Sequence, residues 1–178
     1  MKHLKFFLAA GLTLSALSFN ACSDDDDDDN PLVTKEDRNF MTEAAYGNWS
    51  EVDMGKLADS LSNDGGVKMF GQHMQEDHSK AQDELKGIAD GFDVDLPAAP
   101  DSVHFAARLS MKGLPPAAFD TAYIKGQVKD HEKTIALFEN AAANANRQQL
   151  RDYANKHLPT IKMHKEMADT MLVRLLAR

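Results

Sequence analysis

Four long segments in which apolar residues recur every three or four positions constrain the fold of this chain most strongly. The first begins at Thr34, which together with Asp37 has the form of a helix capping box. The other three are expected over residues 67–91, 116–140 and 147–178. No segment shows the strict alternation of apolar and polar residues that is typical of a half-buried strand. The sequence therefore predicts an all-α fold.

Turn-forming residues mark the connections between these segments. Residues 63–66 and 141–146 predict turns, and residues 92–101, which contain two prolines, predict a loop. A short helix is expected over residues 102–112, and Pro159 predicts a kink inside the last helix. We therefore predict a four-helix bundle with one short extra helix between helices 2 and 3, where the longest connection crosses over.

The N-terminal 21 residues have the layout of an export signal. Lys2 and Lys5 precede an apolar stretch that is shorter than the roughly 20 residues of a membrane span. The single cysteine, Cys22, follows this stretch and resembles the acylated cysteine of a bacterial lipoprotein signal, although Phe19 stands where such signals usually carry leucine. A leftover thiol beside an ordinary cleavage site is the alternative. We expect acyl chains on Cys22 to anchor the protein to a membrane.

Six consecutive aspartates follow Cys22 almost directly. Adjacent like charges cannot fold against each other, so residues 22–33 are expected to form a solvated tether. Calcium binding is a weaker interpretation, because the run lacks the glycine and the alternating ligands of a calcium loop. An acidic run after a lipidated cysteine also resembles the surface-export signal of some Gram-negative lipoproteins. We therefore predict an outer-membrane lipoprotein, with residues 34–178 as its bundle domain. The acidic run is interpreted either as a signal that exposes the protein on the cell surface or as a plain spacer.

Composition excludes several classes of function. The formal charge of −8 offers no basic face for a nucleic acid, so no nucleic-acid partner is expected. One cysteine excludes a disulfide framework and a multi-thiolate metal site. Nucleophilic catalysis has no support, because Cys22 is committed to the anchor and no Gly-x-Ser-x-Gly motif occurs. These absences favour a protein that is not an enzyme.

Each long segment carries one ionisable residue inside its apolar face: Glu51, His78, His131 and His164. Glu51 and His78 both lie roughly 17 Å from the turn between their helices, which places them in one layer. His164 misses the level of His131 by roughly 7 Å, and His157 fits that level better, so both remain candidates. Carboxylate and imidazole groups are suitable ligands for zinc, iron or copper.

Other interpretations of the same layer remain open. A buried Glu/His layer can be purely structural, with members that hydrogen bond to each other and fix the register of the bundle. Haem ligation by two histidines is a third possibility, without a C-x-x-C-H attachment motif. Met74 and Met163 would favour copper, but methionine on a helix face usually fills the core. Di-iron carboxylate chemistry is disfavoured because no Glu-x-x-His motif occurs.

Short motifs in a fixed order give the chain a family resemblance. They are EVDMGKLA at residues 51–58, Met74-x-x-Asp77-His78, Phe119-Asp120-x-x-Tyr123 leading to His131, and Leu158-Pro159 followed by His164. Over residues 35–171 they resemble a ferritin-like family of exported bacterial proteins, known as a domain of unknown function and often described as outer-membrane proteins. The resemblance implies a ferritin-like four-helix bundle and export, but no activity. It favours His164 over His157, because the family pattern has a histidine after that proline.

Two functions are therefore predicted as alternatives. In the first, the lipoprotein binds a transition metal through Glu51, His78, His131 and His164. In the second, it is a non-catalytic interaction module of the cell envelope, and the Glu/His layer only stabilises the fold.

Overall fold

The computed structural model describes residues 33–178, and over this range it contains five helices and no strand, which confirms the all-α prediction. The helices are α1 (Lys35–Leu61), α2 (Gly65–Asp90), α3 (Ser102–Lys112), α4 (Pro116–Asn144) and α5 (Gln148–Leu176). No helix within the described range has both the length and the hydropathy needed to span a membrane. The predicted export signal, Cys22 and nearly all of the predicted tether lie outside the described residues.

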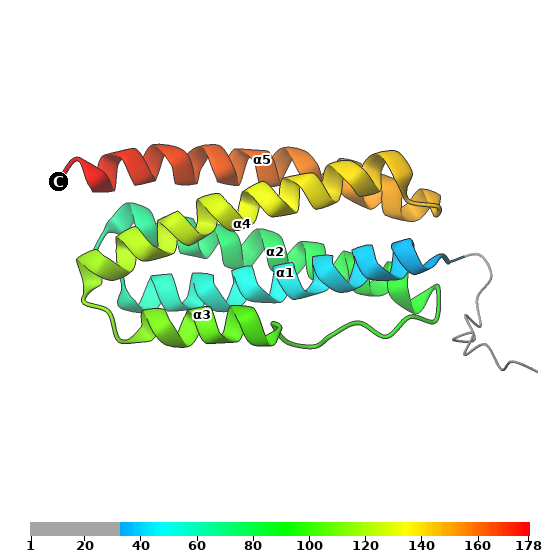
Figure 1. Cartoon of the computed structure of the whole chain (residues 1–178), viewed down its shortest axis with the longest axis horizontal. Helices are drawn as coiled ribbons and strands as arrows, with labels where there is room; N and C mark the ends of the chain where they lie inside the picture. The colour runs from blue at the N-terminus through cyan, green and yellow to red at the C-terminus, as the bar shows by residue number, and fades with distance from the viewer. Residues whose placement is uncertain (1–32) are drawn as a thin grey trace, which may run out of the picture.

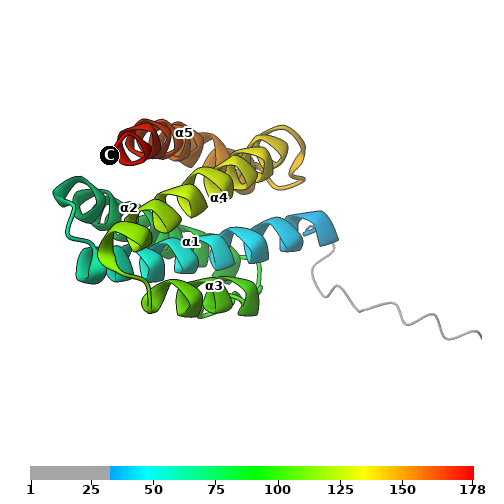
Figure 2. The same cartoon turned by 60° about the vertical axis from the view of Figure 1, so that its left-hand side comes forward.

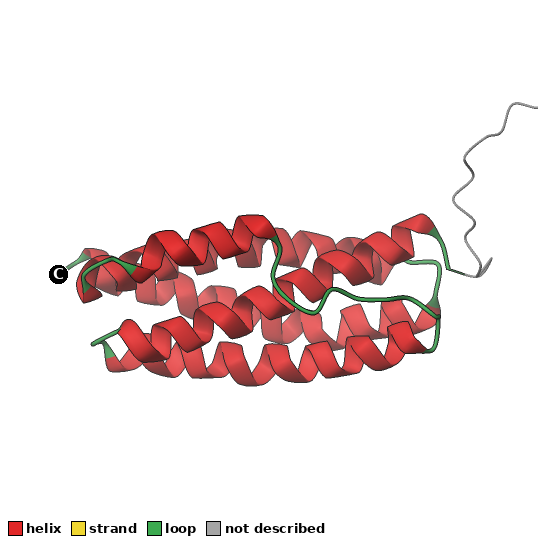
Figure 3. Cartoon of the chain, turned by 90° about the horizontal axis from the view of Figure 1, so that it is seen from below, coloured by secondary structure: helices red, strands yellow, loops and turns green. Residues whose placement is uncertain are grey.

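The four long helices form two antiparallel hairpins, α1 with α2 and α4 with α5 (Figure 1). The hairpins contact each other through α1 against α4 and α2 against α5. The long connection after α2 returns the chain along the outside of the molecule (Figure 3). It leads into α3, which lies over α1 and α4 (Figure 2). Because of this return, α4 starts at the same end of the molecule as α2.

Two predicted turns differ from the structure: α2 begins at Gly65, inside the turn predicted over 63–66, and α4 ends later than expected. The hydroxyl of Thr34 accepts a hydrogen bond from the backbone N–H of Asp37 at 3.1 Å, and the Asp37 carboxylate accepts one from the N–H of Thr34 at 3.3 Å. The turn predicted over 141–146 is displaced, because α4 continues to Asn144. Three consecutive alanines in this stretch are the strongest helix formers, and they extend the helix. α5 is unbroken through Pro159.

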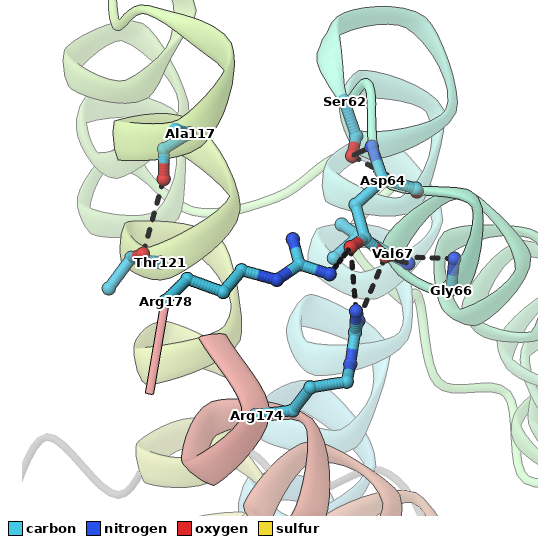
Figure 4. Close-up of polar contacts among 8 residues, drawn as sticks. All are labelled: Ser62, Asp64, Gly66, Val67, Ala117, Thr121, Arg174 and Arg178. Atoms are coloured by element: carbon cyan, nitrogen blue, oxygen red, sulfur yellow. Dashed lines mark hydrogen bonds and ion pairs between the residues drawn. The ribbon is translucent and has the colours of Figure 1, made fainter. Parts of the chain in front are cut away.

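Asp64 links the turn between α1 and α2 to the end of α5 (Figure 4). Its carboxylate caps α2 by accepting hydrogen bonds from the N–H groups of Gly66 and Val67 at 2.9 and 3.0 Å. It also forms ion pairs with Arg174 and Arg178, both at 2.7 Å. The hydrogen bonds from Arg174 hold the pKa of Asp64 well below its usual range. This charge-assisted cap stabilises the position of α5 relative to α2.

A layer of polar side chains divides the hydrophobic core into two clusters. The first cluster includes Phe40 and Phe138, and the second includes Phe70 and Phe119. The two clusters occupy opposite ends of the long helices. Between them lie the buried polar residues Asn48, Glu51, His78, Gln82, Gln127, His131 and His164.

Candidate metal centre

Three histidines from three different helices meet in this polar layer. His78 lies on α2, His131 on α4 and His164 on α5, and their exposed fractions are 5%, 1% and 0%. One ring nitrogen from each histidine lies within 4.8 Å of the other two. The ring centroids are 5.6, 5.6 and 5.9 Å apart. We call these residues the three-histidine cluster. Within residues 33–178 no other group of three His, Cys, Asp or Glu side chains has this spacing.

Hydrogen bonds on the outer side of two rings determine which nitrogen carries the proton. His131 Nδ1 lies 3.0 Å from the backbone carbonyl oxygen of Gln127, which can only accept. His164 uses its other nitrogen, because its Nε2 lies 3.1 Å from a carboxylate oxygen of Asp77. When the rings are neutral, Nδ1 of His131 and Nε2 of His164 are therefore the donors.

A side-chain network fixes the third ring in the same way. Nδ1 of His78 lies 3.0 Å from the side-chain oxygen of Asn48. The Asn48 amide nitrogen donates to Gln82 and to the hydroxyl of Tyr153, both at 3.3 Å. These two bonds orient the Asn48 oxygen towards His78. Nδ1 of His78 therefore carries the hydrogen.

The three remaining ring nitrogens each carry a lone pair. They are Nε2 of His78, Nε2 of His131 and Nδ1 of His164, and all three are buried without a hydrogen-bond partner among the described residues. Leaving such a buried group unpaired costs about 1–3 kcal/mol. An outward N–H bonded to a carbonyl or carboxylate oxygen, with an inward lone pair, is the usual arrangement of metal-ligating histidines.

Burial keeps these imidazoles neutral. Loss of solvent lowers the pKa of His131 to about 4. Burial, with His131 nearby, also lowers the pKa of His164 to about 4, and burial lowers that of His78 well below its usual value. The neutral ring is the form that binds a metal ion, so the cluster is ready to bind at neutral pH.

Glu51 lies beside the three-histidine cluster rather than within it. One of its oxygens accepts a hydrogen bond from the side chain of Gln127 at 2.7 Å. The other lies 3.8 Å from Nδ1 of His131, on the outer side of that ring. Burial raises the pKa of Glu51 to about 7. Of the four predicted ligands, the structure thus brings the three histidines together and places the Glu51 carboxylate on the far side of the His131 ring.

His157, the competing candidate for α5, lies outside the cluster. Its Nε2 is 3.0 Å from a carboxylate oxygen of Glu84, and its ring packs on Tyr153 with centroids 4.6 Å apart. The structure therefore places His164, and not His157, with the other two histidines. Of the two methionines, Met74 is fully buried, whereas Met163 is 46% exposed on the surface.

A small cavity of about 10 Å³ lies next to the cluster between α2 and α5. It is lined by His78 and His164, with Asp77 and Thr160 in its wall. Its volume is about that of one water molecule. The cavity therefore has room for one small species beside His78 and His164.

The sequence contains a signal for one partner of the histidines and none for another. Asn48 lies three residues before Glu51, so helical spacing places it on the inward face of α1, and this signal was sufficient to find it. Nothing in the sequence indicates that Asp77 on α2 hydrogen bonds to His164 on α5, because that contact depends on how the two helices cross.

Comparisons with known proteins concern the family and the fold. The family model described as "Domain of unknown function (DUF4142)" matches residues 23–171. A comparison with curated proteins found no match. Among solved structures, the chain is similar to a crystal structure of a DUF305 fragment from Deinococcus radiodurans, with a TM-score of 0.71 and 14% sequence identity. The similarity covers 81% of this chain and 99% of that chain, and at this identity it shows a shared fold alone.

Proposed function

This chain belongs to the DUF4142 family, and we propose that it is an exported, lipid-anchored protein that binds one transition-metal ion through His78, His131 and His164. We further propose that its helices form a ferritin-like four-helix bundle, with α3 as the extra helix. The bundle supplies rigid helices that hold the ligands from three directions.

One observation carries this proposal: the three inward ring nitrogens have no hydrogen-bond partner among the described residues, while every outward nitrogen has one. A purely structural layer, the alternative function, would pair its members with each other. Glu51 and Gln127 are paired in this way, and they support that alternative for their part of the layer. Each histidine instead keeps one ring nitrogen unpaired, and one ring nitrogen from each lies within 4.8 Å of the other two.

The donor set favours zinc or copper. Imidazole suits both ions, and the three-histidine cluster lacks the carboxylate of typical non-haem iron sites. An ion bound at about 2.0–2.1 Å would hold the nitrogens roughly 3.3 Å apart, so the rings would move inwards by about 1 Å. A fourth position facing the small cavity would stay exchangeable. Such a site suits metal sequestration or sensing.

The location follows from the N-terminal sequence. We propose that residues 1–21 direct export, that acylated Cys22 anchors the chain to the outer membrane, and that residues 22–33 form the tether. Twelve extended residues span roughly 40 Å, which would hold the bundle clear of the membrane surface. The bundle would then meet metal ions on the cell surface.

The metal content of the purified chain tests the proposal. After incubation with zinc or copper and dialysis, we expect about one ion per chain. At a free concentration 100 times the Kd, binding contributes about 2.7 kcal/mol, which raises the melting temperature by about 5–10 °C. The His157→Ala variant is the matched control, and it should retain the full stoichiometry. Protein that takes up neither ion and shows no thermal shift would contradict the proposal.

A further inference from the structure

A cavity of about 560 Å³ lies between α1, α3 and α4, on the opposite side of His131 from the three inward nitrogens. α3 covers it without contributing a buried residue. An ion pair between Arg108 on α3 and Asp53 on α1, at 2.7 Å, holds α3 in place. The connection before α3 is fastened by Trp49, whose ring N–H donates to the carbonyl oxygen of Pro97 at 3.0 Å. This cavity is separate from the proposed metal centre.

The charges that lie deepest in this cavity are acidic. Glu51 is 6% exposed, whereas Asp130 is half-buried and already lies 3.5 Å from the ammonium group of Lys133, which leaves Glu51 as the acidic group for a ligand. The two lysines in the wall, Lys129 and Lys133, are exposed to solvent. One Glu51 oxygen is bonded to Gln127, whereas the oxygen nearest His131 has no hydrogen bond within the described part of the chain. The interior therefore favours a positively charged group.

Two glycines inside helices keep this cavity open. A Cβ on Gly47 would meet nothing within 4 Å, and one on Gly126 would meet only the end of the Met111 side chain at 3.6 Å. Glycine weakens a helix interior relative to alanine. Close packing of α1 against α2 requires glycine at Gly55 and Gly71, because an added Cβ on either would overlap the backbone carbonyl oxygen of the other. Packing does not require glycine at Gly47 or Gly126.

We propose that this cavity binds a small aliphatic amine, whose ammonium group pairs with the carboxylate of Glu51. A charge-assisted hydrogen bond to a buried carboxylate is among the stronger polar contacts in proteins. Val103, Met111 and Leu137 supply apolar wall for the methylene groups of such a ligand. The volume is many times the roughly 10–15 Å³ that a cavity needs to hold one water molecule, so a bare or hydrated inorganic ion would leave this wall unused.

Calorimetric titration of the full chain with 1,4-diaminobutane tests this proposal. We expect one molecule per chain to bind, and the uncharged analogue 1,4-butanediol to bind at least 10-fold more weakly. Glu51→Gln, which keeps the shape and removes the charge, should weaken amine binding by at least 10-fold. Gly47→Leu fills the cavity and should do the same while zinc uptake stays unchanged.

Gly87→Leu is the matched control, because a Cβ on Gly87 also meets nothing within 4 Å and the residue lies on α2 outside the cavity. It should bind the amine as the parent chain does. Thermal melting followed by circular dichroism verifies that each variant is folded. If Glu51→Gln does not fold, amine binding by Gly47→Leu decides the result. Absence of amine binding, equal binding of the diol, or binding unaffected by Gly47→Leu would overturn the proposal. Zinc uptake is measured in a separate experiment, so the amine titration can be interpreted even if the chain binds no zinc.

Discussion

Replacing His131 with alanine is expected to weaken zinc or copper binding by about 60-fold to about 700-fold. Structural zinc sites with four ligands bind with about 10–16 kcal/mol, or roughly 2.5–4 kcal/mol for each ligand. Each 1.4 kcal/mol is a factor of ten in Kd. His131 supplies one of only three protein ligands, and no other histidine is within reach to replace it, because His157 is engaged with Glu84. Competition with a chelator of known affinity measures the change.

A second substitution separates this effect from a general loss of structure. His73 lies on α2, as His78 does, but it is only half-buried and lies outside the three-histidine cluster. His73→Ala should therefore leave the metal affinity unchanged. The melting temperature of each metal-free variant shows whether the fold is intact. If His131→Ala kept the affinity of the parent chain, the three histidines would not be the ligands.

The metal-free protein is expected to lose stability as the pH falls from about 6.5 to about 4. Burial lowers the pKa of His131 to about 4, whereas the unfolded ring titrates near 6.5. Between these values the unfolded chain binds more protons, so acid favours unfolding. The stabilisation is fully present above pH 6.5, and this one residue accounts for about 3 kcal/mol of loss at pH 4. The pKa values of His78 and His164 are lowered as well and act in the same direction.

Glu51 has the opposite dependence on pH. Burial raises its pKa to about 7, while the unfolded carboxyl ionises near 4.5. The folded chain therefore binds more protons in this window, and stability is lost as the pH rises from 4.5 to 7, by about 3 kcal/mol at most. Glu51→Gln removes this opposing contribution, so the free energy of unfolding should rise with pH more steeply in that variant.

Urea denaturation of the metal-free chain between pH 4 and 7.5 measures both effects. His131→Gln, which retains a polar group of similar size without an imidazole, should have a shallower acid dependence than the parent chain. Equal stability at pH 4 and pH 6.5 in Glu51→Gln, which lacks the opposing carboxyl group, would show that the histidines are not buried as the structure places them.

Local signals predicted the helices well because they act within a few residues. Thr34 and Asp37 form the predicted capping box. The turn predicted over 63–66 is shorter than expected, because Gly65 and Gly66 already belong to α2, which Asp64 caps. The end of α4 was misplaced because alanine and asparagine over 141–146 resemble a turn, whereas the helix propensity of three alanines extends the helix to Asn144. The sequence alone does not show whether the turn preference of asparagine or the helix preference of alanine prevails over 141–146.

Helical periodicity also predicted the residues of the candidate site, but not their exact relation. It identified the inward positions of His78, His131 and His164, and the structure brings these together. Counting residues from the expected helix ends separated the levels of His164 and His131 too far, in part because α4 continues to Asn144 and α5 begins only at Gln148. Periodicity also places Glu51 on the inward face of α1, but it does not show that its carboxylate lies near Nδ1 of His131.

Anomalous X-ray diffraction from crystals of the chain grown with zinc locates the bound ion directly. We expect a single strong peak at about 2.0–2.1 Å from Nε2 of His78, Nε2 of His131 and Nδ1 of His164. A zinc ion bound elsewhere, for example between His157 and Glu84, with no peak at the three-histidine cluster, would contradict it.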